Sequence, residues 1–378
     1  MQRAQRNESL VAVIPERVWL MPSAFAPHVG GVEEVTLRLA RSLQKSGSDV
    51  LVVTNRWPLD LPARENIQGV DVARTHFSMP ARRPSTFAQH LRQRKSIDGF
   101  LDALPRPSLV HLHCGSSQLS FARRYAKKRH LPLVFTTHGE SVMDAQGIYQ
   151  KNPYLRRQYR RTAAEAAVLT ACSEWTRRRA AELAPSFDRA RVVLNGVDPG
   201  TWNQARSVVT EPVFAAYGRH VPQKGFDLLL EAFAIVLESL PKAQLLLGGH
   251  GPEYANLQRA AGPQVSFSGK LDTAGVVELL ASCRVVVVPS RIEPFGIVAL
   301  EALGAGRGLV YADSTGLAEA AGSCGRQFVN GDAASLAAQM LSEVAEPTSE
   351  HLGRARAQEL SWESITARYL DAYAQALS

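Results

Sequence analysis

Residues 285–306, VVVVPSRIEPFGIVALEALGAG, join four consecutive valines to an apolar segment through a short polar loop. A β-branched run without polar residues predicts a strand buried in a parallel sheet, and Pro294 predicts the first turn of a helix. Glu293 lies in the loop, and Glu301 lies about two turns further on. Because ligands of open α/β sheets bind beyond the carboxyl ends of the strands, both carboxylates can reach one site.

Backbone N–H groups between the two acids add an anion site to this segment. The first turn of a helix leaves its amides without intrahelical partners, and their direction favours a phosphate. We expect these amides to belong to Phe295, Gly296, Ile297 and Val298. Two acceptors for hydroxyls beside an anion site suit a sugar nucleotide. The spacing alone fits ordinary charge on a helix surface equally well, because Glu-x7-Glu occurs three times in the chain.

The segment 289–306 resembles the Glu-x7-Glu signature of retaining glycosyltransferases of the GT-B fold, specifically glycosyltransferase family 4. The resemblance extends from about Arg17 to Asp332 and includes several further motifs in the order of the family. It implies an α/β protein of two doubly wound, Rossmann-like domains that face an inter-domain cleft. It also implies that Glu293 contacts the transferred sugar and that Glu301 contacts the ribose of the leaving nucleotide.

Short β-rich runs alternate with helical patterns in both halves of the chain, which by itself predicts two parallel sheets. The runs of the first half are 17–23, 48–55, 108–114, 131–138 and 166–173, and the pattern restarts at 212–219. A polar stretch, 198–212, predicts a linker, so we place one domain over residues 1–206 and a second over 207–360. The resemblance implies that the first domain binds the acceptor and the second the nucleotide sugar. It also implies that the last helix, 361–378, crosses back to the first domain.

Length and composition fit a soluble two-domain protein. The chain has 378 residues, of which 45% are apolar and 21% are charged. No apolar run approaches the roughly 20 residues of a membrane span, and the apolar stretch near the N-terminus is too short for a secretory signal. The four cysteines are far apart and form no CxxC or Cys/His cluster, which favours buried thiols in a reducing compartment. We therefore expect a cytoplasmic protein.

The net charge of +8 is distributed unevenly. Residues 1–206 contain 31 Lys and Arg against 17 Asp and Glu, whereas residues 207–378 contain 12 against 18. The basic segments 81–95, 121–130 and 154–161 fit solvated helix faces, and equally contact with an anionic membrane or a phosphorylated acceptor. A peripheral position at the inner face of the membrane is therefore one expectation. Nucleic acid is not expected as a partner, because no nucleic-acid-binding motif accompanies the charge.

Two features of the first half are candidates for the cleft. Gly30 and Gly31 lie between the first predicted strand and helix, where paired glycines let a ligand approach the backbone and a helix start favours a phosphate. They also fit an ordinary strand–helix turn, and they do not match the G-x-G-x-x-G of a dinucleotide site. His138 closes the predicted strand 131–138 and so projects toward the cleft. The resemblance implies that His138 contacts the donor sugar and helps to position the acceptor, with Glu140 as a further acceptor contact.

Arg219 and Lys224 follow the first predicted strand of the second half in a glycine-punctuated loop. An arginine fork and a compact ammonium can hold a diphosphate and stabilise the charge that develops on a leaving group. The alternative is a solvated basic loop, and the resemblance to the family's Gly-Arg…Lys-Gly motif favours the diphosphate clamp. No Asp-x-Asp pair occurs in the chain. We therefore expect no metal ion, and no cofactor beyond a nucleoside-diphosphate sugar that serves as the donor substrate.

The leading interpretation is a retaining hexosyltransferase. It would move a sugar from a UDP- or GDP-sugar to an acceptor hydroxyl of a glycan, a lipid-linked acceptor or a small molecule. Two alternatives stay open: a nucleotide-sugar epimerase or hydrolase of the same fold, and a non-catalytic sugar-nucleotide-binding partner. The presence of all the polar candidates argues against the non-catalytic partner. The missing dinucleotide fingerprint argues against a Rossmann oxidoreductase.

Overall fold

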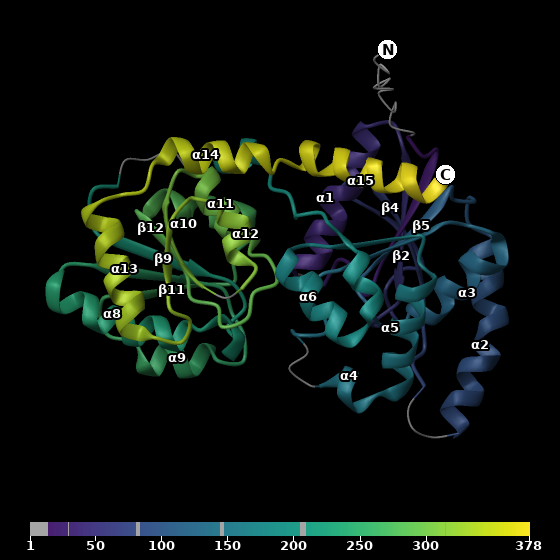
Figure 1. The fold of residues 1–378 in the computed structure, drawn as a ribbon. Coiled ribbons are helices and arrows are strands. Elements are labelled where there is room, and N and C mark those ends of the chain that lie inside the picture. Colours follow the sequence, from purple (N-terminus) through teal and green to yellow (C-terminus); the bar gives the residue numbers. More distant parts are fainter. Residues whose placement is uncertain (1–13, 29, 81–83, 144–146, 205–208, 314) are drawn as a thin grey trace, which may run out of the picture.

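The computed structural model describes residues 14–28, 30–80, 84–143, 147–204, 209–313 and 315–378. The chain forms two α/β domains, each built around its own sheet, and Figure 1 shows them as two lobes side by side. Both domains are Rossmann-like and their sheets are mainly parallel, so the predicted fold class is confirmed.

Eight strands form the sheet of the first domain, in the order β3-β4-β2-β1-β5-β6-β7-β8. All neighbouring strands pair in parallel except β3 and β4, an antiparallel pair at one edge that the sequence pattern did not indicate. The strands are β1 (Arg17–Pro22), β2 (Asp49–Asn55), β3 (Arg64–Ile67), β4 (Val70–Thr75), β5 (Leu109–His113), β6 (Leu133–Thr137), β7 (Val168–Ala171) and β8 (Arg191–Val192). The helices are α1 (Gly31–Lys45), α2 (Pro84–Asp102), α3 (Leu119–Arg129), α4 (Ile148–Lys151), α5 (Pro153–Glu165) and α6 (Glu174–Leu183).

Six parallel strands form the sheet of the second domain, in the order β11-β10-β9-β12-β13-β14. They are β9 (Val213–Tyr217), β10 (Gln244–Gly248), β11 (Val265–Gly269), β12 (Val285–Val288), β13 (Gly308–Ala312) and β14 (Arg326–Phe328). The helices are α7 (Pro199–Trp202), α8 (Phe226–Ser239), α9 (Tyr254–Ala260), α10 (Thr273–Ser282), α11 (Ile297–Gly304), α12 (Leu317–Ala321), α13 (Ala333–Ala345) and α14 (Glu350–Glu359). The last helix, α15 (Trp362–Leu377), lies on the first domain.

The valine run that opened the sequence argument is β12, a central strand. Its four valines are at most 5% exposed, and it pairs with β9 on one side and β13 on the other. Both faces are therefore buried, which explains why the run has no polar alternation. The helix that follows starts later than predicted. It begins at Ile297 rather than near Pro294, because Gly296 takes a φ of 96° and becomes the N-cap.

Two segments cross between the domains next to each other. Val197 and Ser361 form an isolated parallel bridge, and Gly196 packs on Trp362 so closely that an added Cβ would lie 2.8 Å from its ring. Before this crossing, α14 lies on the second domain. After it, α15 lies on the first domain, where it contacts α1 and β5–β7 (Figure 1). The predicted boundary at 206/207 falls within 205–208, outside the described residues. The helix just before it, α7, packs on α11 and α14.

Candidate active site

The central strands of the second sheet place the predicted donor residues at one edge. The strand order changes direction between β9 and β12, and such a switch point is where open α/β sheets bind their ligands. Arg219 and Lys224 follow β9, and Glu293 follows β12. These three residues therefore lie beyond the carboxyl ends of two adjacent strands.

Lys224 and Glu293 form an ion pair, with 2.5 Å between Nζ and Oε2. Glu293 is 8% exposed, and the hydroxyl of Ser290 donates to the same carboxylate oxygen at 3.4 Å. Gly225 lets the loop of Lys224 approach β12: its φ is 68°, and an added Cβ would lie 2.1 Å from the carbonyl oxygen of Pro289. The glycine after Lys224 therefore keeps the ammonium within reach of Glu293.

Glu301 lies in the second turn of α11, beside the end of β9. The hydroxyl of Tyr217 donates to its carboxylate at 2.7 Å. Burial raises the pKa of Glu301 to about 7, and the hydrogen bond from Tyr217 opposes that rise. The charges of Glu34 and Arg38 also act on the carboxyl, so Glu301 lies on the side of the second domain that is turned toward α1.

The start of α11 offers backbone donors next to both acids. An added Cβ at Gly296 would lie 2.3 Å from the side chain of Leu317, and its positive φ also disfavours other residues. No hydrogen bond between described residues uses the amide N–H groups of Phe295, Gly296, Ile297 or Val298. The geometry therefore leaves these donors available for an anion, as a helix start does.

The start of α1 contributes a residue that the sequence argument missed. Glu33 lies in the first turn of α1, and burial raises its pKa while the nearby charges of His28 and Arg219 lower it. Arg219 is therefore close to the helix start where Gly30 and Gly31 lie, although they belong to different domains. Among the described residues, none outside the immediate backbone lies within 4 Å of an added Cβ at Gly31, which leaves room there for a ligand. The sequence could have indicated Glu33, because it is an acidic residue three positions after Gly30 at the start of a helix.

His138 follows β6 and belongs to a row of buried histidines. Its Nε2 lies 3.0 Å from Nδ1 of His113 at the end of β5, and the ring of His113 lies 4.0 Å from that of His111. The row ends at α15, where Nδ1 of His111 lies 2.8 Å from the hydroxyl of Tyr373. Burial lowers the pKa of His138 to about 4, so this side chain is neutral at pH 7. The sequence could have indicated this row of histidines, because His111 and His113 form an H-x-H pattern at the end of a strand.

Glu140, for which we expected an acceptor contact, forms hydrogen bonds within the first domain. Its carboxylate accepts from the hydroxyl of Thr137 at 3.0 Å and from the amides of His138 at 2.9 Å and Gly115 at 2.8 Å. These three donors all belong to the first domain. Glu140 therefore ties the loop after β6 to the loop after β5 and keeps His138 in place.

The two domains meet directly at the site. Gly139 has a φ of 84°, and an added Cβ there would lie 2.6 Å from the ring of Pro294 in the other domain. His138 precedes Gly139, and Glu293 precedes Pro294. The contact between Gly139 and Pro294 therefore brings the loop of His138 and the loop of Glu293 together where the two domains meet.

Metal-ligating clusters, membrane-spanning helices and reactive thiols would each indicate another chemistry. Within the described ranges, no group of three or more His, Cys, Asp or Glu side chains is arranged to hold a metal ion. Over that same part of the chain, no helix has the length and apolar character needed to cross a membrane. The four cysteines are buried and free, and burial raises the pKa of Cys172 and Cys283 to about 12, so these two remain thiols at neutral pH.

Known families match the two halves of the chain separately. The family model described as Glycosyltransferase Family 4 matches residues 29–201, and the model described as Glycosyl transferases group 1 matches residues 211–345. One relative is the GDP-mannose:cellobiosyl-diphosphopolyprenol alpha-mannosyltransferase of Xanthomonas oryzae pv. oryzae. It is 26% identical over 376 residues, which cover 93% of this chain and 95% of that protein.

Solved structures share the fold at lower identity. The sucrose-phosphate synthase of Thermosynechococcus elongatus has a TM-score of 0.75 at 20% identity, with 95% of this chain and 98% of that chain covered. HepE of Anabaena, solved in complex with UDP and glucose, has a TM-score of 0.74 at 17% identity, with 94% and 98% covered. With both domains matched by transferase families, the chain belongs to the GT-B glycosyltransferases, its first half to glycosyltransferase family 4 and its second half to the glycosyl transferases of group 1.

Proposed function

We propose that this glycosyltransferase moves a hexosyl group from a UDP- or GDP-sugar to an acceptor hydroxyl, with retention of the anomeric configuration. The observation that carries the proposal is the Lys224–Glu293 pair at 2.5 Å, which lies at the switch point of the second sheet beside the start of α11, whose first amides form no hydrogen bond with a described residue. A cation, a carboxylate and backbone donors at one sheet edge suit a diphosphate bonded to a sugar. The relative from Xanthomonas, named for GDP-mannose, supports a nucleoside-diphosphate donor.

Each part of the donor has a group suited to it. The diphosphate would lie between Arg219, Lys224 and the start of α11, where the negative charge that develops as the glycosidic bond breaks is stabilised. Glu293 would accept from hydroxyls of the transferred sugar, and Glu301 from the ribose. His138, neutral at pH 7, would form hydrogen bonds to the sugar from the opposite wall without adding charge. No cofactor other than the donor is part of this proposal.

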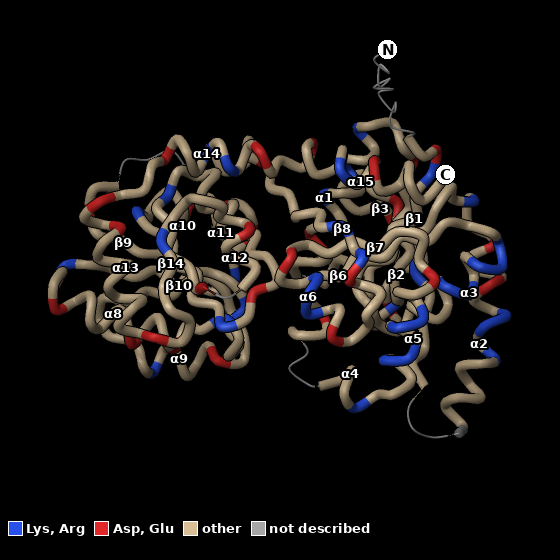
Figure 2. Tube along the Cα trace, in the orientation of Figure 1, with Lys and Arg blue, Asp and Glu red and all other residues tan. Residues whose placement is uncertain are grey.

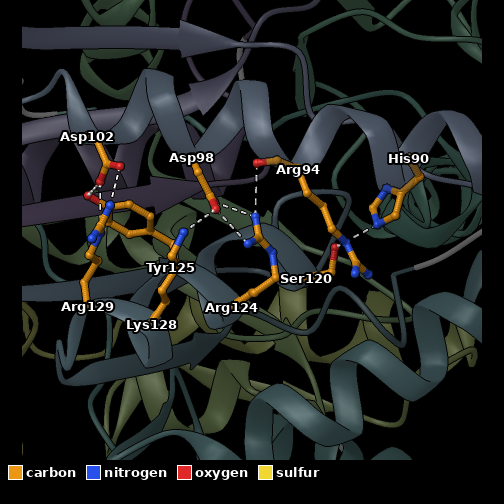
Figure 3. A network of polar contacts seen from close by, with 9 residues as sticks. All are labelled: His90, Arg94, Asp98, Asp102, Ser120, Arg124, Tyr125, Lys128 and Arg129. Carbon is orange, nitrogen blue, oxygen red and sulfur yellow. Dashed lines mark hydrogen bonds and ion pairs between the residues drawn. The ribbon is translucent and has the colours of Figure 1, made fainter.

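The acceptor would bind to the first domain, and a lipid-linked acceptor at an anionic membrane is our specific proposal. Figure 2 shows Lys and Arg residues on α2, α3 and α5, far from the second domain. Many of the charges on α3 are already paired: Arg124 and Lys128 bind Asp98, and Arg129 binds Asp102, all within the first domain (Figure 3). The segment 121–130 is therefore not the free basic face.

The outer stripe of α2 is the better candidate for a membrane contact. Phe87, Leu91 and Lys95 follow one another at helical i, i+4 spacing, and Arg92 lies beside them. Phe87 is 44% exposed and Leu91 is 40% exposed, and neither Arg92 nor Lys95 has an ion pair with another described residue. Apolar and basic side chains on one exposed stripe suit the interface of an anionic bilayer. The relative from Xanthomonas, named for a diphosphopolyprenol acceptor, supports this choice.

A donor screen tests the proposed function. The purified protein is incubated with single UDP- and GDP-sugars, and the released nucleoside diphosphate is measured with and without candidate lipid-linked acceptors. One donor should be consumed slowly by hydrolysis and faster when its acceptor is present. Nucleotide release that no acceptor accelerates, with a free or epimerised sugar as the product, would favour the hydrolase or epimerase instead.

A further inference from the structure

The loop that carries Glu293 is bound to the first domain as well as to Lys224. The carbonyl oxygen of Pro294 accepts hydrogen bonds from the hydroxyl of Ser173 at 2.5 Å and from that of Thr176 at 3.0 Å. Ser173 precedes α6 and Thr176 lies in its first turn, and both are at most 1% exposed. Water therefore does not compete for these bonds in the closed arrangement.

Glu319, on α12 of the second domain, caps the same helix of the first domain. Its carboxylate accepts from the backbone N–H of Glu174 at 2.6 Å and from that of Trp175 at 2.9 Å. Amides in a first helical turn have no intrahelical partner, and the positive end of the helix dipole favours a carboxylate there. Ser173 satisfies a third amide by accepting from Thr176 at 2.9 Å. The start of α6 is thus capped jointly by its own serine and by a carboxylate from the other domain.

Short contacts within the second domain connect Glu319 to Glu293. The amide of Gly316 donates to the carbonyl oxygen of Glu293 at 2.9 Å, and an added Cβ at Gly316 would lie 2.0 Å from the carbonyl oxygen of Pro294. On the other side of α12, Arg356 of α14 donates to the carbonyl oxygen of Glu319 at 2.5 Å. A displacement of α12 away from α6 would therefore displace the loop of Glu293 with it.

We propose that Ser173, Thr176 and Glu319 form an inter-domain clamp, which closes the cleft and positions Glu293 opposite His138 for transfer. The clamp residues are positioning residues, because they act through Pro294 and α12 rather than on the donor. In an open arrangement the Glu319 carboxylate and the α6 amides would each be solvated. Closure exchanges that solvation for charge-assisted hydrogen bonds that also fix the distance between the two walls. The proposal rests on the roles proposed for Glu293 and His138, whereas closure itself can be measured without any sugar transfer.

The first experiment compares three variants with the native enzyme. Glu319→Ala removes both carboxylate oxygens that accept from the α6 amides, Glu319→Gln keeps one neutral oxygen, and Glu182→Ala serves as the matched control. Glu182 lies on α6 as well, but it is exposed and forms an ion pair with Arg179 on the same helix. We expect kcat to fall about tenfold or more in Glu319→Ala, to fall less in Glu319→Gln, and to stay native in Glu182→Ala. The Kd for free nucleoside diphosphate should stay native in all three, because Arg219, Lys224 and Glu301, which we propose to hold the nucleotide, belong to the second domain.

The second experiment measures closure directly. The native cysteines are buried, so cysteines introduced at the exposed residues Gln150, on α4, and Gln258, on α9, can be labelled selectively with a pair of dyes or spin labels. These helices belong to different domains (Figure 1). We expect Glu319→Ala to broaden the inter-domain distance distribution and shift it to longer values, with and without UDP or GDP. The Glu182→Ala protein should match the native distribution.

Ser173→Ala provides a second, milder test if Glu319→Ala does not fold. It removes one bond to Pro294 and should shift the distances and kcat in the same direction. Native distances in folded Glu319→Ala or Ser173→Ala protein would overturn the clamp, and so would a loss of kcat without a shift in distance. Failure of the proposed function has a different outcome: no donor would be consumed by the native enzyme, while the distance shift would still report the clamp.

Discussion

The ammonium of Lys224 lies 2.5 Å from a carboxylate oxygen of Glu293, with 21% and 11% of the two side chains exposed. The cation that we assign to the diphosphate and the acid that we assign to the sugar are therefore one partly buried ion pair. Removing one member of such a pair leaves the other without compensation. Under this assignment Lys224 would have two roles, because it would neutralise the donor phosphates and it also orients the Glu293 carboxylate.

The first prediction concerns this pair and Arg219. Arg219→Ala and Lys224→Ala should each cost about 2–4 kcal/mol of transition-state stabilisation, as the loss of an electrostatic stabiliser does. Lys224→Ala should be the worse of the two, because it also leaves Glu293 unpaired. The measurement is kcat/KM with the preferred donor, and Lys242→Ala, an exposed lysine of the same domain, is the matched control.

A double-mutant cycle isolates the pair itself. Lys224→Ala combined with Glu293→Gln should lose less than the sum of the two single losses, by roughly 0.5–3 kcal/mol, since the residues contact each other. Native kcat/KM in both Arg219→Ala and Lys224→Ala would remove these cations from the mechanism.

The second prediction is that transfer does not need a divalent metal. The chain contains no Asp-x-Asp pair, and Arg219, Lys224 and the start of α11 offer positive charge and donors to the diphosphate instead. Initial rates should be unchanged after dialysis against excess EDTA. A complete loss of rate that Mg²⁺ or Mn²⁺ restores would contradict this expectation.

The third prediction concerns the outer stripe of α2. Native protein should bind anionic vesicles in preference to neutral ones, and binding should weaken with salt, because exposed charges are screened over about 8 Å at physiological ionic strength. The double variant Arg92→Gln with Lys95→Gln should weaken the salt-dependent part of vesicle binding. The double variant Phe87→Ser with Leu91→Ser should weaken the part of vesicle binding that salt does not affect.

The control for the vesicle experiment removes the same charge elsewhere. Lys242→Gln with Arg259→Gln, both exposed on the second domain, should leave vesicle binding native. Equal binding of the native protein to neutral and anionic vesicles at low salt would indicate a solvated basic surface and a soluble acceptor.

The strands and the donor-side loops could be predicted because their signals are local. The four valines of β12 predict a buried strand, and the glycine after Lys224 predicts a tight loop. Each signal lies within a few residues of the chain. The edge pair β3 and β4 escaped prediction because β3, RENI, contains one apolar residue, and β4, VDVART, contains Asp71 and the buried Arg74, so neither strand is an apolar run. The start of α11 was misplaced because Pro294 and Gly296 both fit a helix start, and the positive φ of Gly296 makes it the N-cap.

The pairings across the cleft could not be predicted, since they join distant parts of the chain. Lys224 and Glu293 are 69 positions apart, and Glu174 and Glu319 are 145 apart. A single sequence gives each residue a loop or helix position but no distance to its partner. Once the structure is known, the pairs can be explained, because burying a polar group costs free energy unless the group forms a hydrogen bond or an ion pair.

The fourth prediction separates the two glutamates by their effect on nucleotide binding. Glu301→Gln should weaken the binding of free nucleoside diphosphate as well as the binding of the donor, because a buried ribose hydroxyl that loses its acceptor costs on the order of 1–3 kcal/mol. Glu293→Gln should leave nucleoside diphosphate affinity nearly native, while it slows transfer and reduces discrimination between donor sugars. Calorimetric titration of both variants, together with donor kinetics, measures the difference. The opposite pattern would reverse the assignment of the pair.

The pH dependence of nucleotide binding gives Glu301 a second signature. Its pKa is raised to about 7 by burial, so the ionised fraction grows from about one tenth at pH 6 to about nine tenths at pH 8. Ribose hydroxyls donate to the ionised carboxylate and favour that form, so affinity should rise with pH, by about tenfold over this range. The nucleotide's own phosphate also titrates here, and Glu301→Gln corrects for it because the variant retains only that contribution. Tyr217→Phe removes a donor to the carboxylate and should move the midpoint to higher pH. If Glu301→Gln binds nucleotide with native affinity and the full native pH dependence, Glu301 does not hold the ribose.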